Sequence, residues 1–520
     1  MPTNGDACLD GAWPGRSAAA VDASEFLQSL KDRGATVWFD NEQLRWRAPR
    51  GAIYPEEIAQ LRLRRAEFVN LLSDTLCVER VPLERHVGAA KAPLTGMQRM
   101  PWYLIDRPHP RTMSFGLRLQ GPLDLALLET CLNCLVRRHE TLRTRILITA
   151  DGPIQKIDEY RPRSLRTVNI SSDFDQSSDI KSIHPRIQEF IDQSIDPSIG
   201  PLFDTTIFRI TELDHILAIS VDHVISDASS LFILNEELWT LYLQGARGHA
   251  CDLPAPTLQF SDYALWLESI HDLWYRTHGS YWVQRFSSSP KICWPSDAEL
   301  VEQGAKDHAF LTVPIASKSI VVVTEIARRE QTIPALVVLA MYVMSVFRWS
   351  EQRDLTIAIV DSGRHRSGLA RMVGLLASNV HLRCQLASDL SYHRVLNMVK
   401  SEFSSALAHR DFDWLTSVVP EYEPDLLFNW ISLNPNESIH PDFDVQTASS
   451  LKVSWLDLSA SEGAFAGIDF QVPYKLGLIC NDEGGRIALS LFYRTSFVSA
   501  VAIEQLASDF RSVLESAATQ

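Results

Sequence analysis

The chain has 520 residues, of which 46% are hydrophobic and 22% charged, so a globular protein of several structural units is expected. Its formal net charge of -15 argues against nucleic acid as the main partner, and no apolar run reaches the roughly 18 residues of a membrane span. The first residues lack the features of a signal peptide and the eight cysteines are scattered, so a cytoplasmic protein with reduced thiols is expected.

The first part of the chain divides into a tail and a compact unit. Residues 1–21 are small and polar without periodicity, and we expect them to be disordered. Residues 22–75 start with a helical pattern that stops at Gly34. Alternating residues around an Asp-Asn turn then predict a β-hairpin, and an amphipathic helix begins near Pro55. The order helix, hairpin, helix predicts a small domain.

This small unit carries more basic than acidic residues, although the chain is acidic overall. Arg45 and Arg47 share one face of the second hairpin strand, because side chains in a strand repeat every two residues. With Trp46 and Arg50 they are the candidate residues for partner docking. Two interpretations remain open: a solvated surface, or a dock for an acidic peptide that adds as a strand and pairs with the arginines.

The rest of the chain predicts two α/β lobes. Residues 76–92 have little periodicity and small residues near their end, which indicates a linker. Helical and strand-like runs then alternate to the C-terminus, so we expect one lobe at 93–275 and a second at 276–520. The apolar stretch 333–347 predicts a buried core helix in the second lobe.

No metal site is expected from the cysteines. Cys131 and Cys134 form the one close pair, and they lie in a helical pattern with no second pair of ligands in view. Reduced thiols of the core are the better interpretation.

The stretch HILAISVDHVISDASSL, residues 215–231, is the candidate for chemistry. An apolar strand-like run ends in Asp222 and His223, and Asp227 follows. Imidazole titrates at about pH 6.5, so a histidine at the end of a strand can accept a proton at cellular pH. Adjacent strand residues face opposite ways, which makes Asp222 a poor candidate for orienting His223. Taken alone, the pattern is more often a core histidine between turn aspartates.

Other segments give this stretch a context. It resembles the HHxxxDG motif of nonribosomal peptide synthetase condensation domains. Further motifs of that family are resembled, in family order, by PLTGMQRMPWYL (93–104), RHETLRT (138–144), FSDYALW (260–266), MVGLLASNVHLR (372–383), HRDFDWL (409–415) and LLFNW (426–430). The first unit resembles the β-hairpin docking domains of hybrid polyketide-peptide synthetases, as in tubulysin assembly, mainly through LRWRAPRGAI (44–53).

The resemblance implies an α/β fold of two chloramphenicol-acetyltransferase-like lobes in a V shape, with a tunnel at their seam. It implies acyl transfer from a carrier-bound phosphopantetheine thioester to an amine or an alcohol. His223 falls on the catalytic histidine, which accepts a proton or holds the nucleophile. Asp227 falls on the family aspartate, a structural residue for which we expect Arg143 as the partner. No cofactor of the protein's own and no metal is implied.

Two positions depart from the family motif. Asp222 replaces the first histidine, which changes the packing behind the strand. Ala228 replaces the glycine and penalises a positive φ, so a left-handed turn there would be strained. Ser230, Asn429 and Ser378 are the candidate acceptor or tunnel residues.

Two alternatives stay open at this point. In the first alternative, DHVISDASS fits the DxxxxDxxS signature of heterocyclisation domains. The presence of His223 and of the FNW at 428–430, which resembles the condensation pattern, argues against this alternative. In the second alternative, the lobes are catalytically inactive and serve as a recruitment platform, like the monooxygenase-recruiting domains of glycopeptide assembly lines.

The expected partners follow from the parts that are present. No adenylation or carrier domain follows the second lobe, so we expect an upstream acyl or peptidyl carrier protein to bring the donor, through an acidic C-terminal segment that binds the docking unit. The acceptor is a small molecule or a carrier-bound group, and the expected reaction is chain release as an amide or ester, as in the standalone ester-forming domains of enacyloxin assembly.

Overall fold

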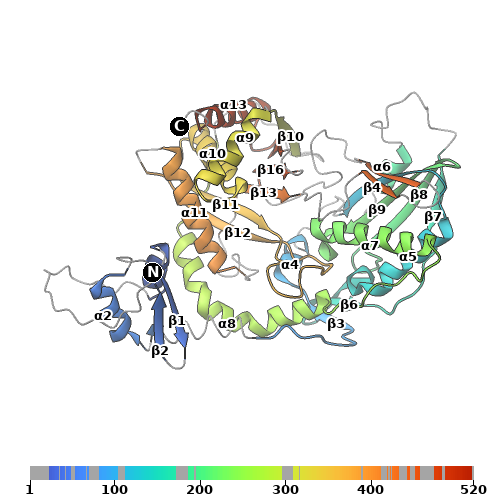
Figure 1. The fold of residues 1–520 in the computed structure, drawn as a ribbon, viewed down its shortest axis with the longest axis horizontal. Coiled ribbons are helices and arrows are strands. Elements are labelled where there is room, and N and C mark those ends of the chain that lie inside the picture. The colour runs from blue at the N-terminus through green and yellow to red at the C-terminus, as the bar shows by residue number, and fades with distance from the viewer. Residues whose placement is uncertain are drawn as a thin grey trace.

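In the computed structural model of the chain, the structure describes residues 23–33, 35–40, 43–47, 53–65, 67–68, 81–102, 112–170, 185–191, 195–294, 308–315, 317–387, 391–410, 419, 422, 424–432, 442–445, 451–456, 474–482 and 487–517. The segment expected to be disordered, residues 1–21, lies outside this set, and so does Arg50. Figure 1 shows a small N-terminal unit and two larger layered lobes, with the long helix α8 (Phe260–Phe286) running from one lobe to the other.

The N-terminal unit has the predicted order of elements. These are α1 (Ala23–Asp32), β1 (Thr36–Asp40), β2 (Gln43–Arg47) and α2 (Pro55–Leu63). The strands form an antiparallel hairpin with Val37 opposite Trp46. Pro55 occupies the first turn of α2, where the missing N–H costs no helical hydrogen bond. Phe26, Leu30 and other apolar side chains give the unit a small core of its own.

The segment expected to be a linker is anchored where the structure describes it, at residues 81–92. The indole of Trp266 donates a hydrogen bond to the Val81 carbonyl, at 3.0 Å. Arg85 lies 2.7 Å from Glu140 and 3.0 Å from the fully buried Asp262. These acids belong to the RHETLRT and FSDYALW segments, so the charge pairs explain what two of the motif positions do.

The N-terminal lobe is a sheet covered by helices. Its elements are β3 (Lys91–Pro93), α4 (Gly96–Trp102), β4 (Thr112–Gln120), α5 (Leu125–Arg138), η1 (Glu140–Arg143), β5 (Thr144–Thr149), β6 (Gly152–Ile157), β7 (Arg166–Asn169), α6 (Pro185–Ile191), β8 (Phe203–Thr211), β9 (Asp214–Asp222), η2 (His223–Ile225) and α7 (Ala228–Ala246). The main sheet has the order β14-β15-β4-β9-β8-β7, in which β14 (Asp442–Val445) and β15 (Leu451–Leu456) come from late in the chain. The helices α5 and α7 share one core with the sheet, and α6 packs on its other face. The central strand β9 is buried along nearly its whole length, as its apolar run predicts.

The C-terminal lobe is a second sheet with its own helical layer. Its elements are α8 (Phe260–Phe286), β10 (His308–Val313), α9 (Ser317–Arg329), α10 (Pro334–Ser350), β11 (Asp354–Asp361), β12 (Ser378–Gln385), α11 (Tyr392–Ala408), β13 (Leu426–Ser432), β14 (Asp442–Val445), β15 (Leu451–Leu456), β16 (Leu476–Asp482), β17 (Ile487–Arg494) and α13 (Ala500–Ala517). The sheet has the order β10-β17-β16-β13-β11-β12. The expected core helix is α10, which begins at Pro334 and is buried over most of its length.

The two lobes are interlocked in a way that the expected division does not contain. The expected boundary between residues 275 and 276 falls inside α8, a continuous helix of 27 residues. The strands β14 and β15 leave the second lobe after β13 and extend the sheet of the first lobe, with Trp455 opposite Leu117. Backbone hydrogen bonding at a free sheet edge therefore joins parts of the chain that are far apart in sequence.

No single helix in the described ranges is long and apolar enough to cross a membrane. One pair of helices, Ser319–Arg329 and Pro334–Ser350, passes that test together, and it is bent by 108°.

Candidate active site

His223 lies just beyond the strand at whose end it was predicted. The strand β9 ends at Asp222, His223 opens the short 3-10 helix η2, and α7 begins at Ala228. The ring Nδ1 lies 2.8 Å from the carbonyl oxygen of Ser226. A carbonyl oxygen only accepts, so Nδ1 carries the hydrogen and Nε2 carries the lone pair. The half-buried ring is thus set to accept a proton at Nε2.

Asp222 caps the turn that carries His223. Its carboxylate accepts a hydrogen bond of 2.8 Å from the Val224 N–H, and it is buried. It acts as the N-cap of η2, a position where aspartate is among the preferred residues. The substitution for the family histidine therefore has a local structural role.

Asp227 pairs with Arg364, and the expectation that Arg143 is its partner is wrong. Arg364 comes from the second lobe, just after β11, and both of its terminal nitrogens lie 2.8 Å from the Asp227 carboxylate. Arg143 instead donates to the Asp158 carbonyl at 2.6 Å and lies 3.9 Å from Glu140. Its position in η1 directs it along the first lobe, whereas Arg364 reaches across the seam. No local pattern in the sequence links Arg364 to Asp227, because the pairing depends on which surfaces of the two lobes meet.

The carboxylate of Asp227 is satisfied from several sides. The N–H groups of Leu376 and Ala377 each donate to it at 3.0 Å, and the Ser230 N–H donates at 2.8 Å. Burial would raise the pKa of Asp227, but the charge of Arg364 and the hydrogen bonds from Arg364 and Ser230 hold that pKa below its ordinary value. A buried ionised carboxylate thus joins the two lobes beside the His223 turn.

Ser230 lies where α7 meets the second lobe, and its role toward an acceptor stays a prediction. Its fully buried hydroxyl lies 2.8 Å from Asp227 and accepts from the Gly374 N–H at 3.0 Å. Gly374 is needed here, because a Cβ at this position would lie 2.2 Å from the ring of Phe260. Close approach of the backbone brings the second lobe into contact with α7.

The strain expected at Ala228 does not arise. Ala228 is the first residue of α7. Among the non-glycine residues that the structure describes, only Gln331 and Glu351 have a positive φ. The chain turns into the helix without the left-handed conformation that would favour glycine.

Asn429 and Ser378 lie in neighbouring parts of the second sheet. Asn429 is buried in β13 and points to the same face of the sheet as Leu427, two residues before it. Ser378 begins β12, opposite Asp361, and points to the same face as Val380. Leu427 and Val380 pack into different clusters, so the strand period assigns the two candidates to opposite faces of the sheet. Their role toward an acceptor stays a prediction.

Trp46 is partly buried and packs against the core of the N-terminal unit, and its role in partner docking stays a prediction. Arg45 and Arg47 are in β2, opposite Trp38 and Thr36.

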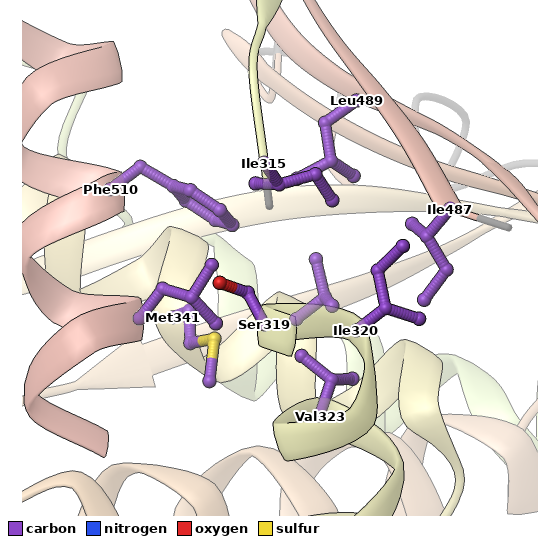
Figure 2. Close-up of a pocket in the computed structure, with 10 residues that line it drawn as sticks. Ile315, Ser319, Ile320, Val323, Met341, Ile487, Leu489 and Phe510 are labelled. Carbon is purple, nitrogen blue, oxygen red and sulfur yellow. The ribbon is translucent and has the colours of Figure 1, made fainter. Parts of the chain in front are cut away.

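Other features lie apart from His223. The pocket in Figure 2 is in the second lobe between α9, α10, β17 and α13, and apolar side chains such as Ile315, Met341 and Phe510 line it, with Ser319 as the polar exception. Cys131 and Cys134 are free thiols. In the described part of the chain, no group of three or more His, Cys, Asp or Glu residues is placed to hold a metal ion.

Fold and site together define a two-lobed condensation fold with a docking unit in front. The family model described as "Condensation domain" matches residues 89–520, and the model described as "TubC N-terminal docking domain" matches residues 24–74. The chain belongs to the condensation-domain family and carries a docking domain of the TubC N-terminal type. The prediction of both parts from the sequence is confirmed.

Curated relatives are much longer synthetases. The chain is 25% identical to chondramide synthase of Chondromyces crocatus over 428 residues, which are 81% of this chain and 11% of that protein. It is 25% identical to gramicidin S synthase 2 of Brevibacillus brevis over 406 residues, which are 76% of this chain and 8% of that protein. The chain thus spans about a tenth of the length of these relatives.

Solved structures confirm the expected fold. The X-domain from teicoplanin biosynthesis matches with a TM-score of 0.72 at 20% identity, over 84% of this chain and 97% of that one. The structure described as the basis for condensation domain-mediated chain release from the enacyloxin polyketide synthase matches with a TM-score of 0.72 at 19% identity, over 98% of both chains. The epimerization domain from the third module of a tyrocidine synthetase matches with a TM-score of 0.68 at 17% identity, over 84% of this chain and 98% of that one.

Proposed function

We propose that the protein transfers an acyl group from a carrier-bound phosphopantetheine thioester to an amine or an alcohol, which forms an amide or an ester. The observation that carries this proposal is the geometry of His223. Its Nδ1–H is engaged by the Ser226 carbonyl at 2.8 Å, so Nε2 is the basic nitrogen. Membership of the condensation-domain family supports the same reaction class.

The proposed reaction requires one proton acceptor. The acceptor nitrogen or oxygen bonds to the thioester carbonyl carbon while its proton passes to Nε2 of His223. The C–S bond then breaks, and the proton leaves with the phosphopantetheine thiolate. General-base assistance of this kind contributes roughly 10²–10⁴-fold to the rate. The donor thioester is a substrate, brought by a partner protein.

The docking unit is proposed to bring that partner. An acidic C-terminal segment of an upstream acyl or peptidyl carrier subunit adds to the hairpin of β1 and β2 and pairs with Arg45 and Arg47. Tethering raises the effective concentration of the thioester at the condensation lobes. Among the residues that the structure describes, the hairpin is a sheet of two strands, whose outer edges could pair with an added strand.

Chain release to a small-molecule acceptor is the form of the reaction that we propose. The likeness to the enacyloxin structure supports it, because that match extends over 98% of both chains and so includes the docking unit. A carrier-bound acceptor is the competing form, and mass spectrometry of the product separates the two.

Turnover with a small thioester tests the proposal. An acyl N-acetylcysteamine thioester is incubated with a panel of amines and diols, and the products of the wild type and His223→Ala are measured by mass spectrometry. We expect the wild type to form an amide or an ester, and we expect the rate of product formation to fall by about 100-fold or more in His223→Ala. Turnover that is equal in both proteins contradicts the role of His223.

Two other outcomes reject condensation itself. No product from any nucleophile, while an acyl-loaded carrier protein still binds, identifies a recruitment platform. A dehydrated ring from a cysteinyl acceptor identifies heterocyclisation.

A further inference from the structure

Two side chains outside the catalytic motif hold the turn that carries His223. The turn comprises residues 222–226, from the end of β9 to the residue before Asp227. Its carbonyl groups at Val224 and Ile225 each accept a hydrogen bond from the side chain of a distant residue. These donors, Gln98 and Thr141, belong to the PLTGMQRM and RHETLRT segments, which the proposed chemistry does not otherwise use.

Gln98 holds the first of these carbonyls. Its fully buried amide Nε2 donates to the Val224 carbonyl at 2.8 Å and lies 3.1 Å from Gln155 Oε1. Its own Oε1 accepts from the Thr95 N–H at 3.0 Å. Every atom of this amide is therefore directed by a neighbour, and the donor toward Val224 has one orientation.

Thr141 holds the second carbonyl. Its buried hydroxyl donates to the Ile225 carbonyl at 3.0 Å. Asp222 restrains the other side of the turn by accepting from the Val224 N–H at 2.8 Å. Side chains of the first lobe thus fix the peptide groups on both sides of Ile225. These peptide groups directly precede the Ser226 carbonyl in the chain.

The Ser226 carbonyl is the group that defines the proton position on His223. If the Val224 and Ile225 peptides rotate, this carbonyl no longer meets Nδ1–H, and the hydrogen is then shared between Nδ1 and Nε2. We propose that Gln98 and Thr141 are positioning residues that keep His223 in the tautomer with a free lone pair at Nε2. This inference rests on the proposed function of His223 and names the residues that maintain it.

The experiment compares three variants with the wild type. Gln98→Leu and Thr141→Val remove the donors, and Thr141→Ser keeps the hydroxyl. The matched control is Thr240→Val, because Thr240 also donates a hydroxyl to a main-chain carbonyl, that of Glu236 at 2.8 Å, but within α7 and away from the turn. We measure kcat and KM for the acyl N-acetylcysteamine thioester, and the ring nitrogens of His223 by nitrogen-15 NMR, assigned by signal loss in His223→Asn.

We expect Gln98→Leu and Thr141→Val to lower kcat by about tenfold, with KM within about twofold; loss of the groups that orient metal-ligating histidines, a comparable task, costs about 10–100-fold. Their His223 nitrogen shifts should indicate a mixture of tautomers, whereas the wild type and Thr240→Val show one. Thr141→Ser should recover most of the lost kcat. The inference is overturned if Thr141→Val matches Thr240→Val in both kcat and tautomer. If His223→Ala turns over normally, the proposed function fails, while the tautomer measurement still decides the positioning role.

Discussion

The ion pair between Asp227 and Arg364 gives the most quantitative prediction. The side chains are 2% and 8% exposed, and Arg364 makes two contacts of 2.8 Å to the carboxylate. Arg364→Met removes both contacts but leaves the Asp227 carboxylate buried. Breaking a buried pair by loss of one partner costs about 3–5 kcal/mol. Because N–H donors of Ser230, Leu376 and Ala377 remain, we expect about 3 kcal/mol, the lower end of that range.

The assay is urea unfolding at several pH values, with a second pair as the control. Arg371 also crosses the seam, to Glu236, but the two side chains are 53% and 34% exposed. Arg371→Met should therefore cost no more than about 1 kcal/mol. Both arginines connect the second lobe to α7. Arg371 also lies 3.7 Å from the buried Glu237, but that carboxylate keeps Arg138 and His139 as partners when Arg371 is replaced.

The pH dependence has a definite sign. The folded-state pKa of Asp227 is below its ordinary value, so the stability that the pair contributes is present above the unfolded pKa of about 3.9 and is lost as pH falls through the lower folded value. The difference between wild type and Arg364→Met should thus be largest near neutral pH and shrink below about pH 4. Equal losses for the two arginine variants, or a difference that does not depend on pH, would refute the reasoning.

Two further predictions concern the turn and the docking unit. Asp222→Ala removes the N-cap of η2 and should cost about 1 kcal/mol in urea unfolding, whereas Asp222→Asn keeps an acceptor and should cost less; equal costs contradict the capping role. Removal of residues 1–75 should weaken transfer from a carrier protein with an acidic C-terminal segment and spare transfer from the N-acetylcysteamine thioester. Equal loss with both donors means that the unit supports the fold. Arg45→Glu combined with Arg47→Glu should weaken binding of the acidic segment, measured by calorimetry, and reduce its salt dependence.

Much of the site could be predicted because its elements are local. The apolar run before Asp222 predicted β9, and the helix–hairpin–helix order of the docking unit followed from residue periodicity and turn residues. The order of several motifs also located His223 and Asp227. These features depend on neighbouring residues in the chain, and local periodicity records them.

The partners across the fold could not be predicted in the same way. Arg364 lies 137 positions after Asp227, and the sequence contained another motif arginine, Arg143, that is nearer along the chain. The pairing of β15 with β4, the burial of Ser230 against Gly374 and the packing of Trp46 also depend on which surfaces meet.

The sequence by itself determined the family, the strand that ends just before His223, and the docking unit, because periodicity and motif order are written along the chain. Only the tertiary structure decided which side chains meet at the seam and which nitrogen of His223 carries the hydrogen. Those outcomes depend on hydrogen bonds from Gln98, Thr141 and Arg364, residues that come near the turn only after the sheets and helices have packed.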